Sequence, residues 1–594
     1  MPITIISRPQ RKRRFKVWDL EWKPHTYELR LCGTYDRHAG YACYETIEQF
    51  CRWEMIPSNH GVWFYAHFGG MADLQFLLEF LVDRPEFRVT GSFSGASCVI
   101  ARVRHGRYTW NFVDSFWLLR SSLRSIANSI GRFKSGPTDD MSESEVAAWY
   151  TGVDFETLRE YNRNDCEVLY LAIERAQETI LEMGGQLQMT LASTAMQLFR
   201  RKFLMHDVDT SSRINEIAKE AYFASRVEVF QKDVNYPGNY YDVNSSFPHA
   251  MTFPMPGHLR ASYAHLPDFV VENYPFLVDA DIMVPDLYLP PIPFRRDNRL
   301  FFPVGRWRTW LTGIDLQLLL ANGGKILRIR ECKVFEDFDD LAEYSRTLYK
   351  MRAATTDPFE RDFYKLLLNS LYGKFAEQPE KTTLLLNPSS EQLAQLDRTT
   401  DELMPGVFFK TREVPIPHAH VPISAYITAI ARRTLFNFLS QANEIHYCDT
   451  DGFSTTEEYP TNNTLGGLKL EKTFSSAIFL VPKLYRWQPS DGNDAVVKAK
   501  GFSLSRDKGA ASAQFDRLVV GGEIEVERMV RIRENFRNRV YRPQDKKFRK
   551  GLRHIEFLQG IYNLDAIPKR FMYPDGHTRP WHMEELRGLT PKKL

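Results

Sequence analysis

Apolar and polar positions along the first 185 residues predict strands and helices in alternation. Short apolar runs rich in β-branched and aromatic residues predict strands over 14–22, 61–68 and 109–116. Apolar residues at helical spacing predict helices over 71–82 and 154–183. Because strands that alternate with helices are typical of α/β domains, we expect one such domain over residues 1–185.

The pattern changes after residue 185. Residues 186–258 end in a strand, NYYDVNSSFP, and a Pro-rich stretch follows. A long helical pattern runs from about Asp339 to Phe375, a polar segment covers 377–418, and a strand pair holds HYCDTDGFS. These changes predict further segments, with boundaries at 186–258, 259–345, 346–376, 377–418, 419–500 and 501–594.

Composition places the chain among globular proteins. Its 594 residues are 43% hydrophobic and 25% charged, and no run of about 18 apolar residues predicts a membrane span. The Arg-rich start lacks the apolar core of a secretory signal and is too short for a transit peptide. Seven cysteines without a C-x-x-C pair favour a reducing compartment and argue against structural zinc.

The net charge of +3 does not by itself indicate a nucleic-acid partner, but its distribution does. Residues 528–553 hold eleven Lys or Arg and only two acids. Phe536, Tyr541 and Phe548 interleave with these charges, which favours nucleic-acid binding over a merely solvated face.

Three segments carry candidate chemistry in the second half of the chain. Asp242 lies near the end of an apolar strand, and Asp449 and Asp451 stand two apart in a second strand. Strand residues two apart point to the same face, so the three carboxylates can meet. Such a cluster is costly without a cation, and its oxygen ligands suit two Mg²⁺ ions that act in phosphoryl transfer.

The third segment, KLLLNSLYGKF, lies between those two and reads as a helix. Lys365, Asn369 and Tyr372 share one helical face, which suits a nucleotide: the cation for phosphates and the ring for the base pair. Arg352 lies earlier on the same helical pattern and can reach the triphosphate. A solvated Lys365 is the alternative interpretation.

A second acidic set lies near the N-terminus. Asp19 and Glu21 stand two apart on an apolar strand, and Asp73 follows. Tyr161 and Asp165 are four apart on a helix and face the same way. Four carboxylates again suggest two metal ions, with the tyrosine placed to orient a water molecule.

DVNSSFP, KLLLNSLYGKF and YCDTDG, in this order, resemble motifs A, B and C of family B DNA polymerases, most closely the protein-primed branch of phages and linear plasmids. The resemblance makes Asp242 and Asp451 the principal metal ligands, with Asp449 and the carbonyl of Val243 beside them. KLY resembles the K-x-Y motif that binds the primer end, which gives that role to Lys483 and Tyr485, assisted by Lys498.

The resemblance also assigns the sugar pocket. Phe247 stands where the family usually has a tyrosine that excludes ribonucleotides, and Ser246 replaces the usual leucine. Gly452 replaces the usual serine after the second motif C aspartate. We therefore expect a bulky gate without its hydroxyl, and a looser pocket floor.

Asp19, Glu21, Asp73, Tyr161 and Asp165 resemble the three motifs of DnaQ-like proofreading 3′→5′ exonucleases. Phe68 and Ala72 depart from the asparagine and aromatic residue that hold single-stranded DNA in that family. Ser115 and Lys134 are weaker candidates for supporting roles. YFASRVEVF, residues 222–230, resembles the family's Y-x-G-G linker with both glycines replaced, or else is a plain strand.

The implied fold is multidomain α/β and α+β: an RNase H-like exonuclease domain, 1–185, then a right-hand polymerase. Its palm is 186–258 and 419–500, its fingers 346–376, and its thumb 501–594. Segments 259–345 and 377–418 are the two terminal-protein insertions, the second of which closes a ring around DNA for processivity and strand displacement.

The implied partners are a DNA template-primer, dNTPs and a terminal protein as primer, with Mg²⁺, or Mn²⁺, as cofactor. We expect a monomer in the cytoplasm of a host cell. Two alternatives stay open: synthesis without a protein primer, and a DNA-binding or nuclease protein with a degenerate polymerase half.

Overall fold

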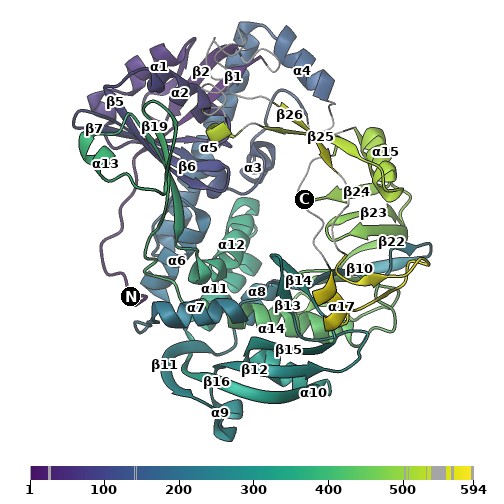
Figure 1. Cartoon of the computed structure of the whole chain (residues 1–594). Coiled ribbons are helices and arrows are strands. Elements are labelled where there is room, and N and C mark those ends of the chain that lie inside the picture. Colours follow the sequence, from purple (N-terminus) through teal and green to yellow (C-terminus); the bar gives the residue numbers. More distant parts are fainter. Residues whose placement is uncertain are drawn as a thin grey trace.

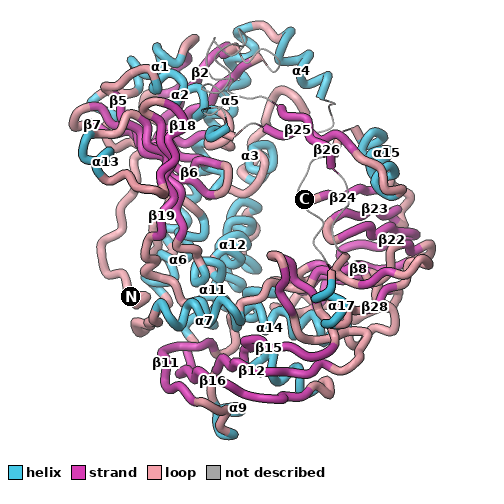
Figure 2. The backbone as a smooth tube through the Cα atoms, in the orientation of Figure 1, coloured by secondary structure: helices cyan, strands magenta, loops and turns pink. Residues whose placement is uncertain are grey.

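The computed structural model describes residues 2–23, 28–138, 141, 143–500, 504–505, 507–529, 531–534, 536, 557–562 and 568–589. Three sheets hold most strands, and helices join and cover them (Figures 1 and 2). Within those residues no helix is long and apolar enough to cross a membrane.

The N-terminal sheet has ten strands in the order β18-β19-β17-β5-β6-β7-β4-β1-β2-β3. Seven of them are β1 Phe15–Trp22, β2 Leu29–Asp36, β3 Gly40–Tyr44, β4 Trp63–Ala66, β5 Phe87–Ser94, β6 Ser97–His105 and β7 Tyr108–Asp114. The helices around it are α1 Ile47–Glu54, α2 Asp73–Val82, α3 Leu123–Ser129, α4 Glu143–Gly152 and α5 Phe155–Glu182, with short 3₁₀ turns at Pro57–Asn59 and Ser115–Trp117. The predicted alternation of strands and helices is therefore present.

The alternation of β1 decides which of its side chains face which helices. Phe15 and Val17 pack in a core shared with α5, whereas Trp18 and Leu20 pack in a core shared with α1 and α2. Odd-numbered residues of this strand therefore face α5, because successive strand residues point to opposite sides.

The remaining three strands of this sheet come from far along the chain: β17 Glu380–Leu386, β18 Thr400–Met404 and β19 Val407–Glu413. Strand β17 pairs antiparallel with β5, with Leu384 opposite Gly91. Leu384, Leu386 and Phe409 are buried in the same core as α1 and α2. The segment 377–418, predicted as polar, therefore also carries apolar positions that contribute to the core of the N-terminal sheet.

The central sheet runs in the order β24-β23-β22-β10-β21-β20-β8, with β9 paired to β22. Its strands are β8 Val227–Val229, β9 Asp233–Val234, β10 Gly238–Val243, β20 Tyr447–Asp449, β21 Gly452–Thr455, β22 Leu468–Val481, β23 Leu484–Pro489 and β24 Val496–Ala499. Leu435 and Leu439 of the largely buried helix α14, Val421–Leu439, share a core with Tyr241 and Phe453 of this sheet.

Residues 259–345 contribute most of a four-stranded antiparallel sheet, ordered β11-β16-β12-β15. Its elements are β11 Met255–Tyr263, α9 Asp268–Asn273, β12 Phe276–Val284, β15 Gly305–Thr312, α10 Gly313–Ala321 and β16 Lys325–Phe338, with a small hairpin of β13 Phe294–Arg296 and β14 Arg299–Phe301. It has its own apolar core, which also holds Met583 from the C-terminal part of the chain.

The predicted long helix from Asp339 to Phe375 is two helices. Helix α11 covers Asp340–Ala354 and α12 covers Pro358–Ser370, and a 3₁₀ turn follows at Tyr372–Ala376. The break falls before Pro358, because proline disfavours helical backbone at the preceding residue and lacks an amide hydrogen. Smaller helices are α6 Leu191–Lys202, α7 Ser212–Ala221, α8 Ser246–Ala250 and α13 Ser390–Ala394.

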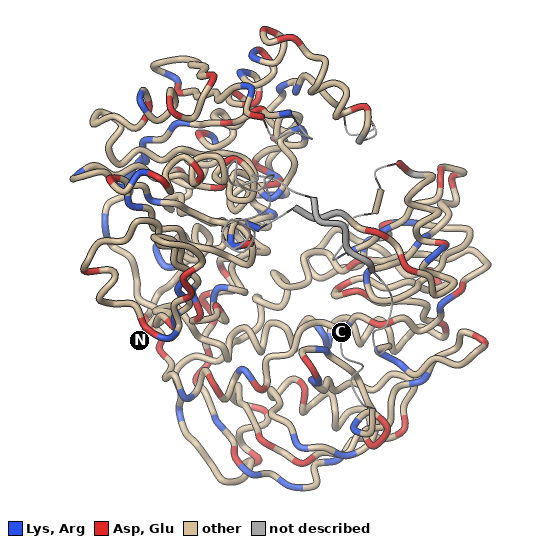
Figure 3. Tube along the Cα trace, turned by 45° about the horizontal axis from the view of Figure 1, so that its top comes forward, with Lys and Arg blue, Asp and Glu red and all other residues tan. Residues whose placement is uncertain are grey.

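The described C-terminal elements are α15 Lys508–Val519, β25 Ile524–Met529, β26 Phe557–Tyr562, β27 Phe571–Met572, β28 Thr578–Arg579 and α17 Met583–Gly588. Most of the basic stripe 528–553 lies outside the described residues. Elsewhere acidic and basic residues intersperse along the whole trace (Figure 3), in keeping with 77 Lys and Arg against 74 Asp and Glu.

Candidate active sites

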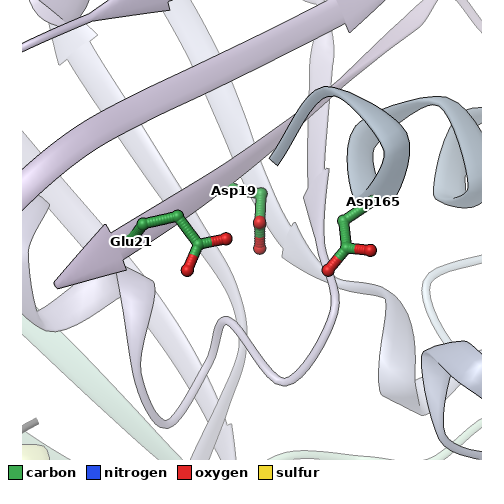
Figure 4. Close-up of side chains that lie close together, drawn as sticks. All are labelled: Asp19, Glu21 and Asp165. Carbon is green, nitrogen blue, oxygen red and sulfur yellow. The ribbon is translucent and has the colours of Figure 1, made fainter. Parts of the chain in front are cut away.

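Three carboxylates converge between β1 and α5. One ligand atom from each of Asp19, Glu21 and Asp165 lies within 4.8 Å of the others. Figure 4 shows the three side chains side by side, with Asp19 and Glu21 on the strand and Asp165 on the helix. They meet because the odd-numbered residues of β1 face α5. We call this group the N-terminal cluster.

Burial and mutual repulsion disfavour the charged forms of the N-terminal cluster. Burial, followed by the neighbouring carboxylates, raises the pKa of Asp19 well above its usual range. Burial raises the pKa of Glu21 to about 8, with repulsion from Asp165 as the next cause. A hard divalent cation would remove this penalty and accept oxygen ligands from all three residues.

A buried amide supports the N-terminal cluster from within α5. The amide nitrogen of Asn162 donates to Asp19 Oδ2 over 2.9 Å and to Glu21 Oε1 over 3.5 Å. The hydroxyl of Tyr41 donates to the side-chain oxygen Oδ1 of Asn162 over 2.9 Å. Our sequence reasoning missed Asn162, although it lies next to Tyr161 on the helix.

Tyr161 and Lys134 adjoin the same cluster. Lys134 Nζ donates to the Tyr161 hydroxyl over 3.0 Å and pairs with the Asp165 carboxylate. The hydroxyls of Tyr150 and Tyr161 are 3.2 Å apart. Burial, then the charges of Asp165 and Glu21, raises the pKa of Tyr161, so this phenol stays protonated.

Asp73 is not among the three carboxylates that converge within 4.8 Å, but its charge contributes to the raised pKa of Asp19. It begins α2, and its Oδ1 accepts a hydrogen bond from the Leu20 amide over 3.0 Å. Burial raises its pKa to about 7, and the nearby Asp114 contributes to this rise. Asp114 is a buried acid that the motifs did not reveal, with its own pKa raised to about 6 by burial.

Asp114 also organises an aromatic surface. Its Oδ1 accepts from the Phe116 amide over 3.0 Å, and its charge is further stabilised by the backbone of Phe68. The rings of Phe68 and Phe116 stack with centroids 4.2 Å apart, and Phe68 keeps 45% of its surface exposed. The Arg120 guanidinium lies 5.1 Å from the Phe116 ring. We call Phe68, Phe116 and Arg120 the aromatic platform.

The second acidic set sits on the central sheet, but its geometry differs from the prediction. Asp449 ends β20, Gly452 begins β21, and these two residues pair across the hairpin. Asp451 therefore lies in the two-residue turn between them, not two positions along one strand. Asp242, on the neighbouring strand β10, pairs with Gly452 of β21. The Val243 amide donates to the Asp451 carbonyl oxygen over 2.9 Å.

Asp449 is already engaged by other side chains. Its Oδ1 lies 2.5 Å from Lys483 Nζ and 2.9 Å from the Thr450 hydroxyl, and its Oδ2 accepts from Tyr447 over 3.3 Å. Lys483 was predicted to bind the primer end, and in this structure its ammonium group forms an ion pair with Asp449 of motif C. Across strands β23 and β24, Tyr485 stands opposite Lys498.

The other two carboxylates are electrostatically coupled. Burial raises the pKa of Asp242 to about 6, opposed by the positive charges of Lys469 and Lys365. Burial and then repulsion from Asp242 raise the pKa of Asp451 to about 7. Lys365 therefore lies close enough for its charge to lower the pKa of Asp242.

Aromatic stacking joins motifs A and B. The Phe247 ring stacks on the Tyr372 ring, with centroids 4.3 Å apart. Helix α12 ends at Ser370, so Tyr372 stands on the following 3₁₀ turn, whereas the sequence predicted it on the helix. Arg352 donates to the Ser245 hydroxyl over 3.3 Å.

Two further predicted residues differ in exposure. Ser246 is buried at the start of α8, and Asn369 is exposed on α12.

The chain is similar in sequence to known DNA polymerases. The family described as DNA polymerase type B, organellar and viral, matches residues 150–451. A probable DNA polymerase of Ascobolus immersus is 30% identical over 340 residues, which are 53% of this chain and 28% of that protein. The DNA-directed DNA polymerase of Enterobacteria phage PRD1 is 27% identical over 510 residues, 81% of this chain and 82% of that protein.

Solved structures share the fold. Phi29 DNA polymerase complexed with primer-template DNA and incoming nucleotide substrates superposes with a TM-score of 0.70 at 17% identity, over 93% of this chain and 100% of that one. Phi29 DNA polymerase in an orthorhombic crystal form gives a TM-score of 0.72 at 16% identity. The first two fungal relatives are much longer than their matched parts, since the chain covers only 28% and 36% of them.

Proposed function

Because the chain belongs to the family of organellar and viral type B DNA polymerases, we propose that it is a DNA-directed DNA polymerase with a proofreading 3′→5′ exonuclease. The observation that carries the polymerase half is the placement of Asp242 beside the Asp449–Asp451 hairpin, across from Lys365. The observation that carries the exonuclease half is the convergence of Asp19, Glu21 and Asp165.

Both sites fit divalent metal ions of the Mg²⁺ type, for which Mn²⁺ can substitute. Asp19, Glu21 and Asp165 would hold them in the N-terminal cluster, with Asp73 nearby. Asp242, Asp451 and the carbonyl of Val243 would hold them in the central sheet, where substrate phosphates complete the ligands. When bound, such ions stabilise negative charge on attacking and leaving oxygens.

The chain's own residues then position the nucleotide. Lys365 supplies a positive charge for the triphosphate, and Arg352 stands one helix away for the same task. The stacked rings of Phe247 and Tyr372 form a rigid wall for the sugar and the base pair. Tyr485 and Lys498, opposite each other on adjacent strands, grip the primer end.

In the exonuclease half, polar side chains of the chain itself hold the attacking water molecule and the carboxylates in position. The Tyr161 hydroxyl, held by Lys134, is placed to orient a water molecule for attack on the terminal phosphodiester. Asn162 fixes the carboxylate orientations of Asp19 and Glu21. The aromatic platform offers ring faces to unpaired bases and takes the place of the asparagine that Phe68 replaces.

A primed template and one labelled dNTP test the polymerase half. The parent should extend the primer, and Asp242→Asn should lose at least about 1000-fold of the rate, because several kcal/mol of charge stabilisation depend on this ligand. Asp281→Asn, which removes a surface partner of Arg330 in the four-stranded sheet, is the matched control. Absence of extension by the parent would refute the proposed polymerase.

The double variant Asp19→Ala/Glu21→Ala tests the exonuclease half. It should lose degradation of single-stranded DNA from the 3′ end and keep primer extension, because the two carboxylate sets lie on different sheets. Unchanged degradation by this variant would mean that other residues cut DNA.

We propose further that a terminal protein supplies the priming hydroxyl. The resemblance assigns such contacts to 259–345, which holds most of the four-stranded sheet, and to 377–418, which holds β17, β18 and β19. Incubation with labelled dNTP, Mg²⁺ and proteins of the same genetic element should give a covalent nucleotide–protein adduct. Extension of DNA primers without any adduct would favour the nucleic-acid-primed alternative.

A further inference from the structure

Three charged side chains are fully buried beneath the motif C hairpin. Arg226, Glu228 and Arg570 expose 3%, 1% and 1% of their surfaces. Glu228 lies on strand β8, Arg226 directly precedes that strand, and Arg570 comes from the C-terminal segment 568–589. Buried charges are costly to desolvate, so a cluster of three needs close mutual contacts. We call these residues the Arg–Glu cluster.

Glu228 stands between the two arginines. Its Oε2 accepts from Arg226 Nε over 2.7 Å and lies 3.7 Å from Arg570 Nη1. Arg226 also donates to the Pro290 carbonyl oxygen over 2.9 Å, and its guanidinium lies 4.2 Å from the Phe302 ring. Removing Arg570 would therefore leave Glu228 with one cation and change how it holds Arg226.

The C-terminal segment holds Arg570 firmly in place. Arg570 Nε donates to the Thr578 hydroxyl over 2.9 Å, and Nη2 donates to the Tyr288 carbonyl oxygen over 3.0 Å. Thr578 in turn donates to the Phe230 carbonyl oxygen over 2.7 Å, just beyond β8. The segment is thus tied to the residue after β8 and to the loop that follows β12.

The backbone of the same strand supports the turn that carries the motif C carboxylates. The Thr450 amide donates to the Arg226 carbonyl oxygen over 2.9 Å, and Val227 pairs with Asp449. Thr450 has φ +67°, a left-handed conformation that is unfavourable for a β-branched residue. Such a conformation persists only where surrounding contacts hold it, and the Arg226 carbonyl is one of these contacts.

We propose that the C-terminal segment is a positioning element of the polymerase site, acting from Arg570 through Glu228 and Arg226 on the turn at Thr450. The proposal rests on the proposed function, since it assigns Asp449 and Asp451 to that site. The Arg–Glu cluster lies at the central sheet and the N-terminal cluster at the ten-stranded sheet, so the exonuclease should not depend on the Arg–Glu cluster.

Hydrogen–deuterium exchange of the metal-free protein tests this link directly. In Arg570→Gln, peptides that span 447–453 should exchange at least about tenfold faster than in the parent, because the Thr450 amide loses a well-placed acceptor. Peptides from β1 should exchange at the parent's rate. This measurement needs neither metal nor activity.

Enzyme assays give the second measurement. Arg570→Gln should raise the Mg²⁺ concentration for half-maximal primer extension about tenfold, the low end of the loss that follows removal of a direct partner of a metal ligand. The KM for primer-template and the exonuclease rate should stay unchanged. Arg570→Lys keeps the positive charge and should recover part of the loss.

Arg579→Gln is the matched control. Arg579 lies in the same C-terminal segment, but its guanidinium pairs with Glu585 over 2.7 Å and not with Glu228. This variant should behave as the parent in exchange and in the Mg²⁺ titration.

Parent-like exchange and Mg²⁺ dependence in Arg570→Gln would overturn the positioning role and leave the proposed polymerase intact. Equal losses of polymerase and exonuclease would also overturn it, because they would indicate general destabilisation. A parent protein that extends no primer would refute the proposed polymerase and the positioning role together.

Discussion

The ring of Phe247 stacks on the ring of Tyr372, with the centroids 4.3 Å apart and an interplanar angle of 13°. This contact joins α8, which follows the motif A strand, to the turn after α12, and it fixes the Phe247 ring edge in one orientation. A gate of this kind excludes a substituent by volume, so its effect depends on how rigidly the ring is held.

Phe247→Val should therefore admit ribonucleotides. The smaller side chain leaves room for a 2′-hydroxyl, and the loss of stacking frees Tyr372. We expect discrimination between dNTP and rNTP to fall at least about tenfold, as for other steric pockets. The ratio of kcat/KM values for the two substrates measures it, with Phe247→Tyr as the control that keeps the ring. An unchanged ratio would place the gate elsewhere.

The aromatic platform should grip the unpaired 3′ end. Phe68→Ala removes an exposed ring that stacks on Phe116, and base stacking is worth about 1–3 kcal/mol per base. The KM for single-stranded DNA in the exonuclease assay should rise about tenfold, with little change in kcat. Phe133→Ala, which removes another exposed ring, is the control. A fall in kcat alone would point to a structural role.

The buried acid Asp73 should make the metal-free protein less stable at high pH. A carboxyl has a pKa near 4 when unfolded and about 7 here, so the native state keeps its proton longer. The stability that this proton provides is complete below about pH 4 and is lost as the pH rises through about 7, at most about 4 kcal/mol in total.

Asp73→Asn should therefore raise the Tm of the metal-free protein at pH 8 and leave it unchanged near pH 4. The exposed residue Glu220 provides the control Glu220→Gln. Mg²⁺ should raise the Tm of the parent more at pH 8 than at pH 5, because the cation replaces bound protons. A lower Tm for Asp73→Asn at pH 8 would contradict this account.

Processivity should depend on a contact between the C-terminal part and the N-terminal sheet. Phe536 and Ile532 are buried in the same core as Leu403 and Phe409 of the 377–418 segment. Phe536→Ser should loosen this contact and shorten products on a primed circle under an enzyme trap, increasingly so with salt. Single-nucleotide addition should survive.

The exposed pair Arg533–Asp401 beside this contact supplies the control Asp401→Asn, since surface ion pairs contribute little. Full-length, trap-resistant products from Phe536→Ser would show that this contact does not retain DNA. Deleting 377–405 instead would remove β17 and β18 from the ten-stranded sheet, together with the buried Leu384, so a loss of activity would be uninformative.

Local pattern was enough to predict β1, α2 and α5, because apolar spacing depends only on neighbours along the chain. The same logic placed Asp19 and Glu21 on one face of β1, and the structure brings them to Asp165. The order of motifs A, B and C likewise predicted the family without any coordinates.

Only the tertiary structure decided which distant segments pair. Strand β17 pairs with β5, which lies some 290 residues earlier in the chain, and so extends the N-terminal sheet. Lys483 reaches Asp449, and Asn162 reaches Asp19, through contacts that no spacing in the sequence announces. Arg570 belongs to the same class, since its partner Glu228 lies on a strand in another part of the chain.

The physical reason is the same in each case. Hydrogen bonds, ion pairs and apolar contacts act over a few ångströms in space, and a sequence gives spatial neighbours only within one helix turn or one strand. The amino-acid sequence by itself therefore determined the chemical groups and their local elements. The packing of sheets and helices determined which of those groups share a site.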